Sequence, residues 1–474
     1  MILGTSLGVM VGAIPGLTGA MLIALTLPLT FSMGAENALV LLVSMYVGSV
    51  SGGLVTATLL RMPGTPASIM TTLDGYPMAK SGRPGRALGL GVTASFVGGL
   101  VSWGFLVLLA KPMADWSTKF GPFEFFSLVL MALVLMATVG GKSLAKGLLA
   151  GFLGILATMP GTSPATGEVR WNFGFDAMNG GFKLLPVLVG LFAVNQVIRD
   201  IVHMEEPLER IRLRKEKVLV GFGELKKYAG NLLRSSVIGT WVGILPGIGA
   251  NIGSVMAYSA TKSLSNDPGQ FGNGSEEGIL SAESANNATV GGALIPLVAM
   301  GIPGSVIDAI LLGAFVIHGL QPGPLLFEQN PEVVHTIMGT MFLANFFMFG
   351  FMLLSMRLLT KLASTPRAIL LPVILTFCVV GSFALGNRIF DVWVMLGFGF
   401  FGLLMEKLDI PLAPFVIGFV LAPVAERELS GGLMQSGGSF LPLVTRPIPL
   451  CFCMVALAML ILSLVRRIPK TDET

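Results

Sequence analysis

The sequence predicts an all-α membrane protein that crosses the bilayer many times. Of its 474 residues, 53% are hydrophobic and only 12% are charged, whereas charged residues make up about a quarter of a soluble globular domain. Apolar stretches of roughly 20 residues, the length of a membrane-spanning helix, recur from end to end. These stretches are continuous and rich in Leu, Ala, Gly and Met, without the alternation of transmembrane β-strands. We therefore expect a polytopic bundle of about a dozen spans.

The apolar stretches give the expected spans in order. They are 36–60, 87–110, 123–139, 144–159, 183–202, 277–300, 333–360, 367–385, 389–405, 410–424 and 447–465. Four further apolar segments are interrupted at Pro15, Pro63, Pro246 and Pro303. Because Pro and Gly stop helices, these four are expected to be broken, re-entrant segments.

The basic residues favour a membrane orientation signal over nucleic-acid binding. The net charge is +4 and the pI about 9.0, but Lys and Arg lie in short loops between spans, as the positive-inside rule requires. One long polar stretch, 203–228, is expected to be a basic cytoplasmic linker. The tail "VRRIPKTDET" begins with two arginines, which favours a cytoplasmic C-terminus. The three cysteines show no metal or disulfide spacing.

Three sequence echoes indicate an internal repeat. "VGAIPGLTGA" (11–20) returns as "VGILPGIGAN" (242–251), and "RMPGTPAS" (61–68) returns as "GIPGSVID" (301–308). "KSGRPG" (80–85) corresponds to "HGLQPG" (318–323). The expected organisation is a first transmembrane repeat 1–202, the linker 203–228, a second repeat 229–425, and a C-terminal span and tail 426–474.

Charge bias favours an inverted arrangement of the two repeats. The first loop after a Pro-Gly break carries Lys80, Arg83 and Arg86, whereas its counterpart, 318–324, has no Lys or Arg. Corresponding loops with opposite charge bias are expected on opposite sides of the membrane.

The paired Pro-Gly breaks predict a substrate site made of helix starts. Breaks at corresponding places in two repeats indicate where a transporter binds its substrate. Thr65 is expected as an N-cap with Pro66 at the first helical position, and Ser305 aligns with Thr65. Free N–H groups at such helix starts suit a carboxylate. The alternative is a set of packing kinks. The candidate substrate-binding residues are Gly16, Gly64, Thr65, Pro66, Ala67, Ser68, Gly247, Gly249, Asn251, Gly304 and Ser305.

A polar cluster within 275–296 predicts a coupling-ion site. Glu283, Asn286 and Asn287 are spaced to share one helix face, with Ser284 beside them. Their oxygens suit Na⁺, or the glutamate could relay a proton. The alternative for the amides is hydrogen bonding between helices, but two in a row favour function. Glu276 and Glu277 are expected to complement the helix dipole.

Two further charged residues leave alternatives open. Asp308 lies in the apolar run "GSVIDAILLGAF", and an acid at membrane depth is a functional candidate for ion coupling. The spacing from Ser305 also fits a capping box, and the two interpretations are equally supported. Arg61 could pair with a substrate carboxylate, although extension of its side chain to the membrane surface is favoured.

These residues resemble the large membrane subunit of tripartite tricarboxylate transporters, the TctA family, over nearly the whole chain. The stretches that carry the resemblance are "PGTPASIMTTLDGYPMAKSGRPGRALG", "GILPGIGANIGSVMAYSATK", "ESANNATVGGALIPLVAMGIPGS" and "HGLQPGPLLF". It implies a secondary transporter of the bacterial inner membrane, driven by Na⁺ or H⁺. Its implied partners are a small TctB-like membrane subunit, a periplasmic TctC-like solute-binding protein, a carboxylate of the tricarboxylate or dicarboxylate class, and membrane lipid. The similarity in plan to elevator transporters places the Pro-Gly hairpins at the substrate.

Two other classes of function compete with transport. A membrane-embedded enzyme is disfavoured because the three histidines show no H-E-x-x-H spacing and "GGKS" (140–143) lacks the first Gly of a phosphate loop. We expect no catalytic residues and no cofactor. An anion channel would also use broken helices, but repeats offset by half the chain favour alternating access.

Overall fold

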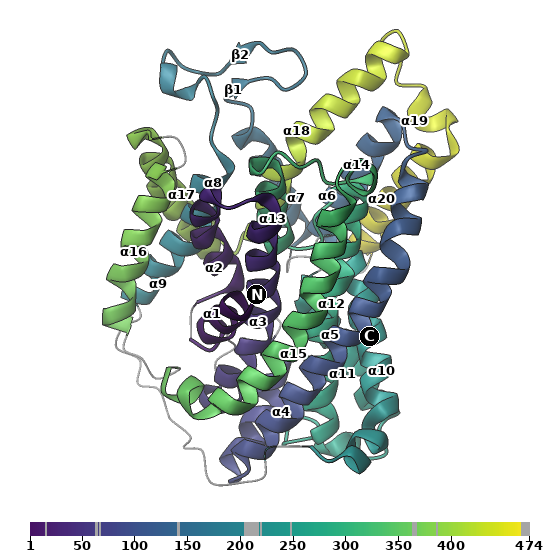
Figure 1. Cartoon of the computed structure of the whole chain (residues 1–474). Coiled ribbons are helices and arrows are strands. Elements are labelled where there is room, and N and C mark those ends of the chain that lie inside the picture. Colours follow the sequence, from purple (N-terminus) through teal and green to yellow (C-terminus); the bar gives the residue numbers. More distant parts are fainter. Residues whose placement is uncertain are drawn as a thin grey trace, which may run out of the picture.

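The computed structural model describes residues 1–14, 17–61, 65, 68–139, 143–202, 218, 220–246, 249–362, 367–384 and 387–465. Within these ranges the chain is almost entirely helical, as Figure 1 shows. One antiparallel strand pair, β1 (Gly161–Thr162) and β2 (Val169–Arg170), stands above the helices in Figure 1. In its register Gly161 pairs with Arg170 and Thr162 with Val169.

The helices follow the apolar stretches of the sequence. Before the linker they are α1 (Ile2–Gly12), α2 (Gly19–Thr26), η1 (Leu27–Ser32), α3 (Ala35–Leu60), α4 (Ile69–Lys80), α5 (Pro84–Ser117), α6 (Pro122–Val139), α7 (Leu144–Ala157), η3 (Asp176–Met178), α8 (Leu184–Leu188), η4 (Val189–Val194) and α9 (Asn195–Val202). After it they are α10 (Phe222–Ile244), α11 (Gly249–Leu264), η5 (Pro268–Gln270), α12 (Glu276–Met300), α13 (Val306–Ile317), α14 (Pro324–Gln329), α15 (Pro331–Leu362), α16 (Arg367–Ala384), α17 (Ile389–Lys407), α18 (Leu412–Gln435), α19 (Pro442–Thr445) and α20 (Pro447–Val465).

Five helical segments of the described chain are long and apolar enough to cross a membrane. They are Ala35–Leu60, Pro84–Ser117, Leu184–Val202, Pro331–Leu362 and Ile389–Lys407. The all-α membrane class is therefore confirmed, while the number of spans stays a prediction. One boundary differs from expectation: α10 begins at Phe222, inside the stretch predicted as linker. Tyr228 is already buried in this helix. Most of the rest of 203–228 lies outside the described residues, so the linker itself stays a prediction.

Glycines bring two pairs of helices into close contact. A Cβ atom added at Gly8 or Gly12 of α1 would collide with the α3 backbone, at Met45 O and Ser49 O. The same holds for α10 and α12, where a Cβ at Gly239 would lie 2.3 Å from Ala285 O. Small residues at such spacing let helix backbones approach closely, which is the main source of packing energy between helices in lipid.

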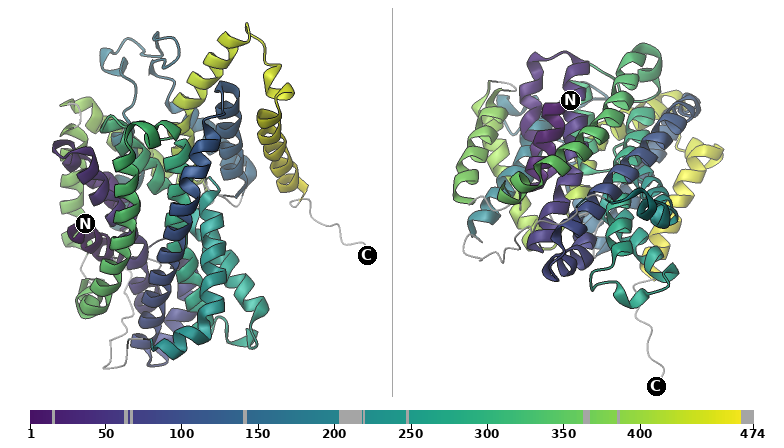
Figure 2. Two further views of the ribbon diagram at one scale, coloured as in Figure 1. Left: turned by 45° about the vertical axis from the view of Figure 1, so that its right-hand side comes forward. Right: turned by 60° about the horizontal axis from the view of Figure 1, so that its bottom comes forward.

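The centre of the bundle is α12. Every residue of α12 from Gly278 to Met300 is buried, and the helix packs against α5, α10, α11 and α4. It begins at Ser275, whose hydroxyl accepts from Gly278 N at 3.1 Å, and ends at Gly301, whose φ of 71° is left-handed. The C-terminal helices α18 to α20 lie at one edge (Figure 2). Polar side chains on α12 therefore face protein rather than lipid.

Candidate functional site

One face of α3 meets the starts of three other helices. Tyr46 Oη lies 3.3 Å from Oγ of Ser305, the cap of α13. A Cβ at Gly19, the first residue of α2, would touch the Ser49 side chain, and one at Gly53 would lie 3.1 Å from Oγ of Ser68. Positions 46, 49 and 53 share a helix face. The rise along the helix axis from position 46 to position 53 is about 10 Å.

The start of α4 lies beyond the predicted cap. The helix begins at Ile69 with Ser68, not Thr65, at its N-cap position. The Ser68 hydroxyl donates to Thr65 O at 2.8 Å and accepts from Thr65 N at 3.2 Å. This closed turn occupies the Ser68 oxygen, so the regular helix begins after it. Ser68 N also donates to Thr65 O at 3.0 Å, and Pro66 and Ala67 lie outside the described residues. Thr65 as a cap with Pro66 at the first helical position therefore stays a prediction, and both Thr65 and Ser68 lie against α3.

The start of α13 agrees with the predicted cap. Ser305 has extended backbone, and its hydroxyl accepts from Asp308 N at 3.4 Å. Asp308 is completely buried. Neither carboxylate oxygen makes a hydrogen bond of normal geometry with a described residue, although the Tyr46 and Ser305 hydroxyls lie close to the carboxylate. The reciprocal half of a capping box is thus not formed. A buried acid without a well-formed hydrogen bond or a cation is costly, which favours the functional interpretation of Asp308.

The remaining candidate substrate residues are described only in part. Gly304 is buried, and a Cβ there would lie 2.8 Å from Gly243 O. Gly249 is the first residue of α11, and Asn251 on the same helix is exposed. Gly16, Gly64, Pro66, Ala67 and Gly247 lie outside the described residues. As α2 contacts α3 at Gly19, α11 contacts α12 at Gly253, where an added Cβ would meet the Thr289 side chain.

The polar residues of α12 form a buried row that reaches the first half of the chain. Glu283 accepts from the Thr71 hydroxyl at 2.5 Å and from the Ser95 hydroxyl at 3.2 Å. Asn287 accepts from the Ser51 hydroxyl at 2.6 Å and donates to Glu283 O at 3.1 Å. The carboxylate and one predicted amide are therefore held by α3, α4 and α5. These bonds are those expected of packing between helices.

Asn286 and Ser284 behave differently from these two. Neither polar atom of the buried Asn286 side chain makes a hydrogen bond of normal geometry in the described structure, although the amide lies close to the Glu283 carboxylate; buried polar groups normally have a well-formed bond. The Ser284 hydroxyl makes only a long bond of 3.4 Å to Ser281 O within its own helix. Among the described residues no group of three or more His, Cys, Asp or Glu is placed to hold a metal.

Sequence reasoning missed Asp74. This buried acid accepts from three backbone N–H groups, those of Gly272, Gly274 and Ser275, at 2.8 to 3.0 Å. It also accepts from the Tyr258 hydroxyl at 2.8 Å. The bonds join α4 to the loop that precedes α12. The available signal was the single acid of a helix whose other charged residue is Lys80 at its end, which does not identify so distant a partner.

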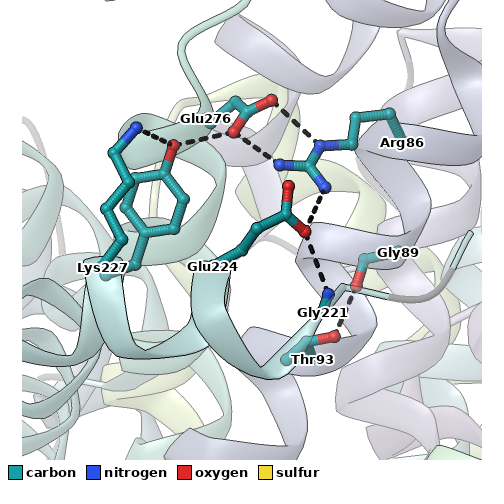
Figure 3. A network of polar contacts seen from close by, with 8 residues as sticks. Arg86, Gly89, Thr93, Gly221, Glu224, Lys227 and Glu276 are labelled. Atoms are coloured by element: carbon teal, nitrogen blue, oxygen red, sulfur yellow. Dashed lines mark hydrogen bonds and ion pairs between the residues drawn. The ribbon is translucent and has the colours of Figure 1, made fainter.

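An ion-pair network joins the ends of α5, α10 and α12 (Figure 3). Arg86 donates to both carboxylate oxygens of Glu276, at 2.8 and 3.0 Å, and to Glu224 at 3.0 Å. The Tyr228 hydroxyl donates to Glu276 at 2.8 Å. The Arg86 guanidinium holds the pKa of Glu276 below its ordinary value. Glu276 therefore does more than complement a helix dipole, because it ties together segments 190 positions apart.

Arg61 does not approach the candidate substrate residues through any described hydrogen bond. It ends α3 with a left-handed φ of 56° and is exposed. Its guanidinium carbon lies 5.7 Å from the centre of the Tyr76 ring, a distance that permits a cation–π contact. This position agrees with a side chain directed to the surface.

Comparison with known proteins places the chain in a family. The model of the tripartite tricarboxylate transporter TctA family matches residues 1–417. The chain belongs to this family. Membership in the TctA family implies the large subunit of a tripartite tricarboxylate transporter and fits a protein that is not an enzyme.

Two relatives come from Agrobacterium vitis. An uncharacterized 52.8 kDa protein in the TAR-I ttuC' 3' region is 32% identical over 472 residues, which are 99% of this chain and 94% of that protein. An uncharacterized protein in the TAR-II ttuC' 3' region is 34% identical over 236 residues, 50% of this chain and 98% of that protein. No solved structure matches the chain. The TctA family assignment therefore rests on sequence over almost the whole length.

Proposed function

We propose that this TctA-family chain is the permease subunit for ion-driven uptake of a carboxylate across the bacterial inner membrane. The observation that carries the proposal is the convergence of helix starts on one face of α3. The caps of α13 and α4, Ser305 and Ser68, both lie against that face. Helix starts supply N–H donors and a positive dipole end without a buried cation. A small TctB-like membrane subunit and a TctC-like binding protein would complete the system.

We further propose that the chain consists of two inverted repeats that alternate access in an elevator-like manner. Packing relationships support the repeat: α1 lies on α3 as α10 lies on α12, and α12 packs on α5 as α3 packs on α15. The short helices α4 and α13 lie toward opposite ends of the bundle in Figure 1, as opposite topology requires.

The coupling ion is proposed to be Na⁺ or H⁺, bound among Glu283, Ser284, Asn286, Asn287 and Asp308. Asn286 and Asp308 support this because their buried polar atoms make no hydrogen bond of normal geometry with a described residue. A bound cation or proton would remove the cost of these unpaired groups.

Uptake into proteoliposomes that contain the chain and both partner subunits tests the proposal. Radiolabelled citrate and shorter dicarboxylates should accumulate saturably, and only when a Na⁺ or pH gradient and the loaded binding protein are present. Conductance at channel rates without a gradient would instead show an anion channel, and conversion of the substrate would show an enzyme. Either result would overturn the proposal.

A further inference from the structure

An apolar groove opens on the outer surface far from the α3 face. It lies between α7, α17 and α18 and has a volume of about 490 Å³, within the range of sites for small ligands. Its lining is entirely apolar or aromatic, including Phe182, Phe390, Trp393, Phe398 and Phe415. Trp393 is 66% exposed, and α17 is one of the segments able to cross a membrane. An exposed apolar groove on a helix of this kind is expected to face the bilayer.

Two cations meet at one end of this groove. A Cβ added at Gly180 would lie 3.5 Å from Lys183 Nζ and 3.8 Å from Arg388 Nη1, so both groups approach the same point. Lys183 directly follows the lining residue Phe182, and the Arg388 guanidinium carbon lies 5.9 Å from the ring centre of Phe390, which also lines the groove. The cationic end thus continues directly into the apolar walls.

The charge of Lys183 is not balanced locally. Arg388 is already engaged, because it donates to Asp391 at 2.7 Å and to Ala177 O at 3.2 Å. Lys183 is exposed and forms no hydrogen bond or ion pair with any described residue. Asp176, the acid of the same segment, is also exposed and makes no described ion pair. An anionic group at this end would therefore complement Lys183, with Arg388 beside it.

We propose that the groove binds one acyl chain of a membrane phospholipid, with the lipid phosphate at Lys183 and Arg388. A helix with its side chains is about 10 to 12 Å across, whereas a single acyl chain can follow a narrow groove. Transfer of an acyl chain from the bilayer into an apolar groove has little hydrophobic driving force, since lipid tails are as apolar as the walls. Selectivity must therefore come from close packing in the groove and from the phosphate contact. This proposal stands independently of the transport proposal.

Native mass spectrometry of the purified chain with added dioleoyl phosphatidylglycerol tests the site. We expect one retained lipid per chain, and at least a fivefold loss of occupancy in both Gly397→Phe and Lys183→Gln. Gly397 lines the groove and has open space at its Cβ position, so the new ring fills the groove without displacing the backbone. Lys183→Gln changes only an exposed side chain.

Matched controls separate this site from general lipid contact. Gly350→Phe on α15 also enters open space, and Lys119→Gln removes another exposed lysine; both should retain the lipid. Dioleoylglycerol, which has the same chains without phosphate, should be retained at least fivefold less. Equal retention of dioleoylglycerol, or equal loss in the controls, would overturn the proposal. So would a Gly397→Phe variant that keeps its lipid but no longer copurifies with the small membrane subunit, because the groove would then hold a protein helix.

Discussion

At the scale of single residues, the buried polar groups fall into two sets, those with well-formed hydrogen bonds and those without. Glu283 and Asn287 have hydroxyl partners on other helices, whereas Asn286 and Asp308 make no hydrogen bond of normal geometry with a described residue. A satisfied buried group stabilises the fold, and an unsatisfied one destabilises it until a ligand arrives. The unpaired groups are therefore the better candidates for direct contact with a transported species.

The first prediction concerns Ser305. Ser305→Ala should weaken the apparent affinity for the carboxylate about tenfold, or about 1.4 kcal/mol, the scale of one hydrogen bond to a charged group. Initial uptake rates at varied substrate concentration measure this. Ser143→Ala is the matched control, because Ser143 caps α7 through a comparable 3.5 Å bond to Lys146 N. An equal loss in both variants would mean that only helix capping is affected.

The second prediction distinguishes the two neighbouring amides. Asn286 makes no hydrogen bond of normal geometry, although its amide lies near the Glu283 carboxylate, so Asn286→Ala should lower the melting temperature less than Asn287→Ala while raising the Na⁺ concentration for half-maximal uptake. Asn287→Ala removes two buried hydrogen bonds, the one from the Ser51 hydroxyl, which keeps Val47 O as an acceptor, and the one to Glu283 O. It should destabilise the fold by about 1–3 kcal/mol. Melting curves and ion titrations of both variants provide the test. An unchanged ion dependence for Asn286→Ala, at normal expression, would remove it from the ion site.

At the scale of elements, the ends of helices carry the long-range connections. Two contacts meet at the start of α12. Asp74 of α4 accepts from Ser275 N, and Arg86 of α5 donates to Glu276. Both bonds join the two halves of the chain. Because α12 is buried throughout, these end contacts fix the position of its whole polar row. Loss of one of them should lower stability without altering any group in the candidate site.

The third prediction concerns the pH dependence of the Arg86–Glu276 contact. Arg86 lowers the pKa of Glu276 from its ordinary 4.5, so this contribution is complete above pH 4.5 and disappears as the pH falls through the lowered pKa. Glu276→Gln should cost about 2 kcal/mol at pH 7. Its melting-temperature deficit should shrink steadily below pH 4.5.

Glu277→Gln is the control for this prediction, because Glu277 accepts from the Ser265 hydroxyl at 2.6 Å rather than from an arginine. It should show a small deficit with no such trend. A Glu276→Gln deficit that stays constant down to pH 3 would contradict the assignment.

The sequence predicted the helical elements better than their ends. Apolar runs gave α3, α12 and α15 to within two residues at each end, since membrane spans are set by length and hydrophobicity. The run 87–110 was too short for α5, which extends from Pro84 to Ser117. The exact start of α10 at Phe222 could not be read from the sequence, because its charged first turns resemble a linker. Nor does the sequence show that Ser68 bonds back to Thr65.

The candidate site was predictable only where chemistry is local. Ser305 as a helix cap followed from its own neighbours, and its cap bond to Asp308 N confirms this. Tyr46, Thr71 and Ser95 could not be found in this way, because each reaches a partner about 190 or more positions away. Ordinary residues in apolar helices become site candidates only when the fold brings their partners to them.

At the scale of the whole molecule, the two predicted repeats differ in the charge of their corresponding loops. The charged loop after α4 and the loop before α14 lie at opposite ends of the bundle in Figure 1. The first carries Lys80 and Arg83, and the second, 318–324, carries neither Lys nor Arg. Because only the first of these two corresponding loops is positively charged, the positive-inside rule predicts that the α4 end faces the cytoplasm.

The last prediction tests this topology in a chain whose Cys378, Cys451 and Cys453 are replaced by Ser. Single cysteines at Arg83 and Gln321, both exposed, should react with a membrane-impermeant maleimide from opposite sides of the bilayer. Gln321→Cys should label in intact spheroplasts, and Arg83→Cys only after the membrane is opened. Lys119→Cys is the internal control: α5 begins beside Arg83 and ends just before Lys119, so this cysteine should label with Gln321→Cys. Labelling of Lys119→Cys and Arg83→Cys from opposite sides would show that α5 crosses the membrane. If Arg83→Cys and Gln321→Cys then label from the same side, the repeats are parallel. The helix starts of α4 and α13 could not then be related by inversion.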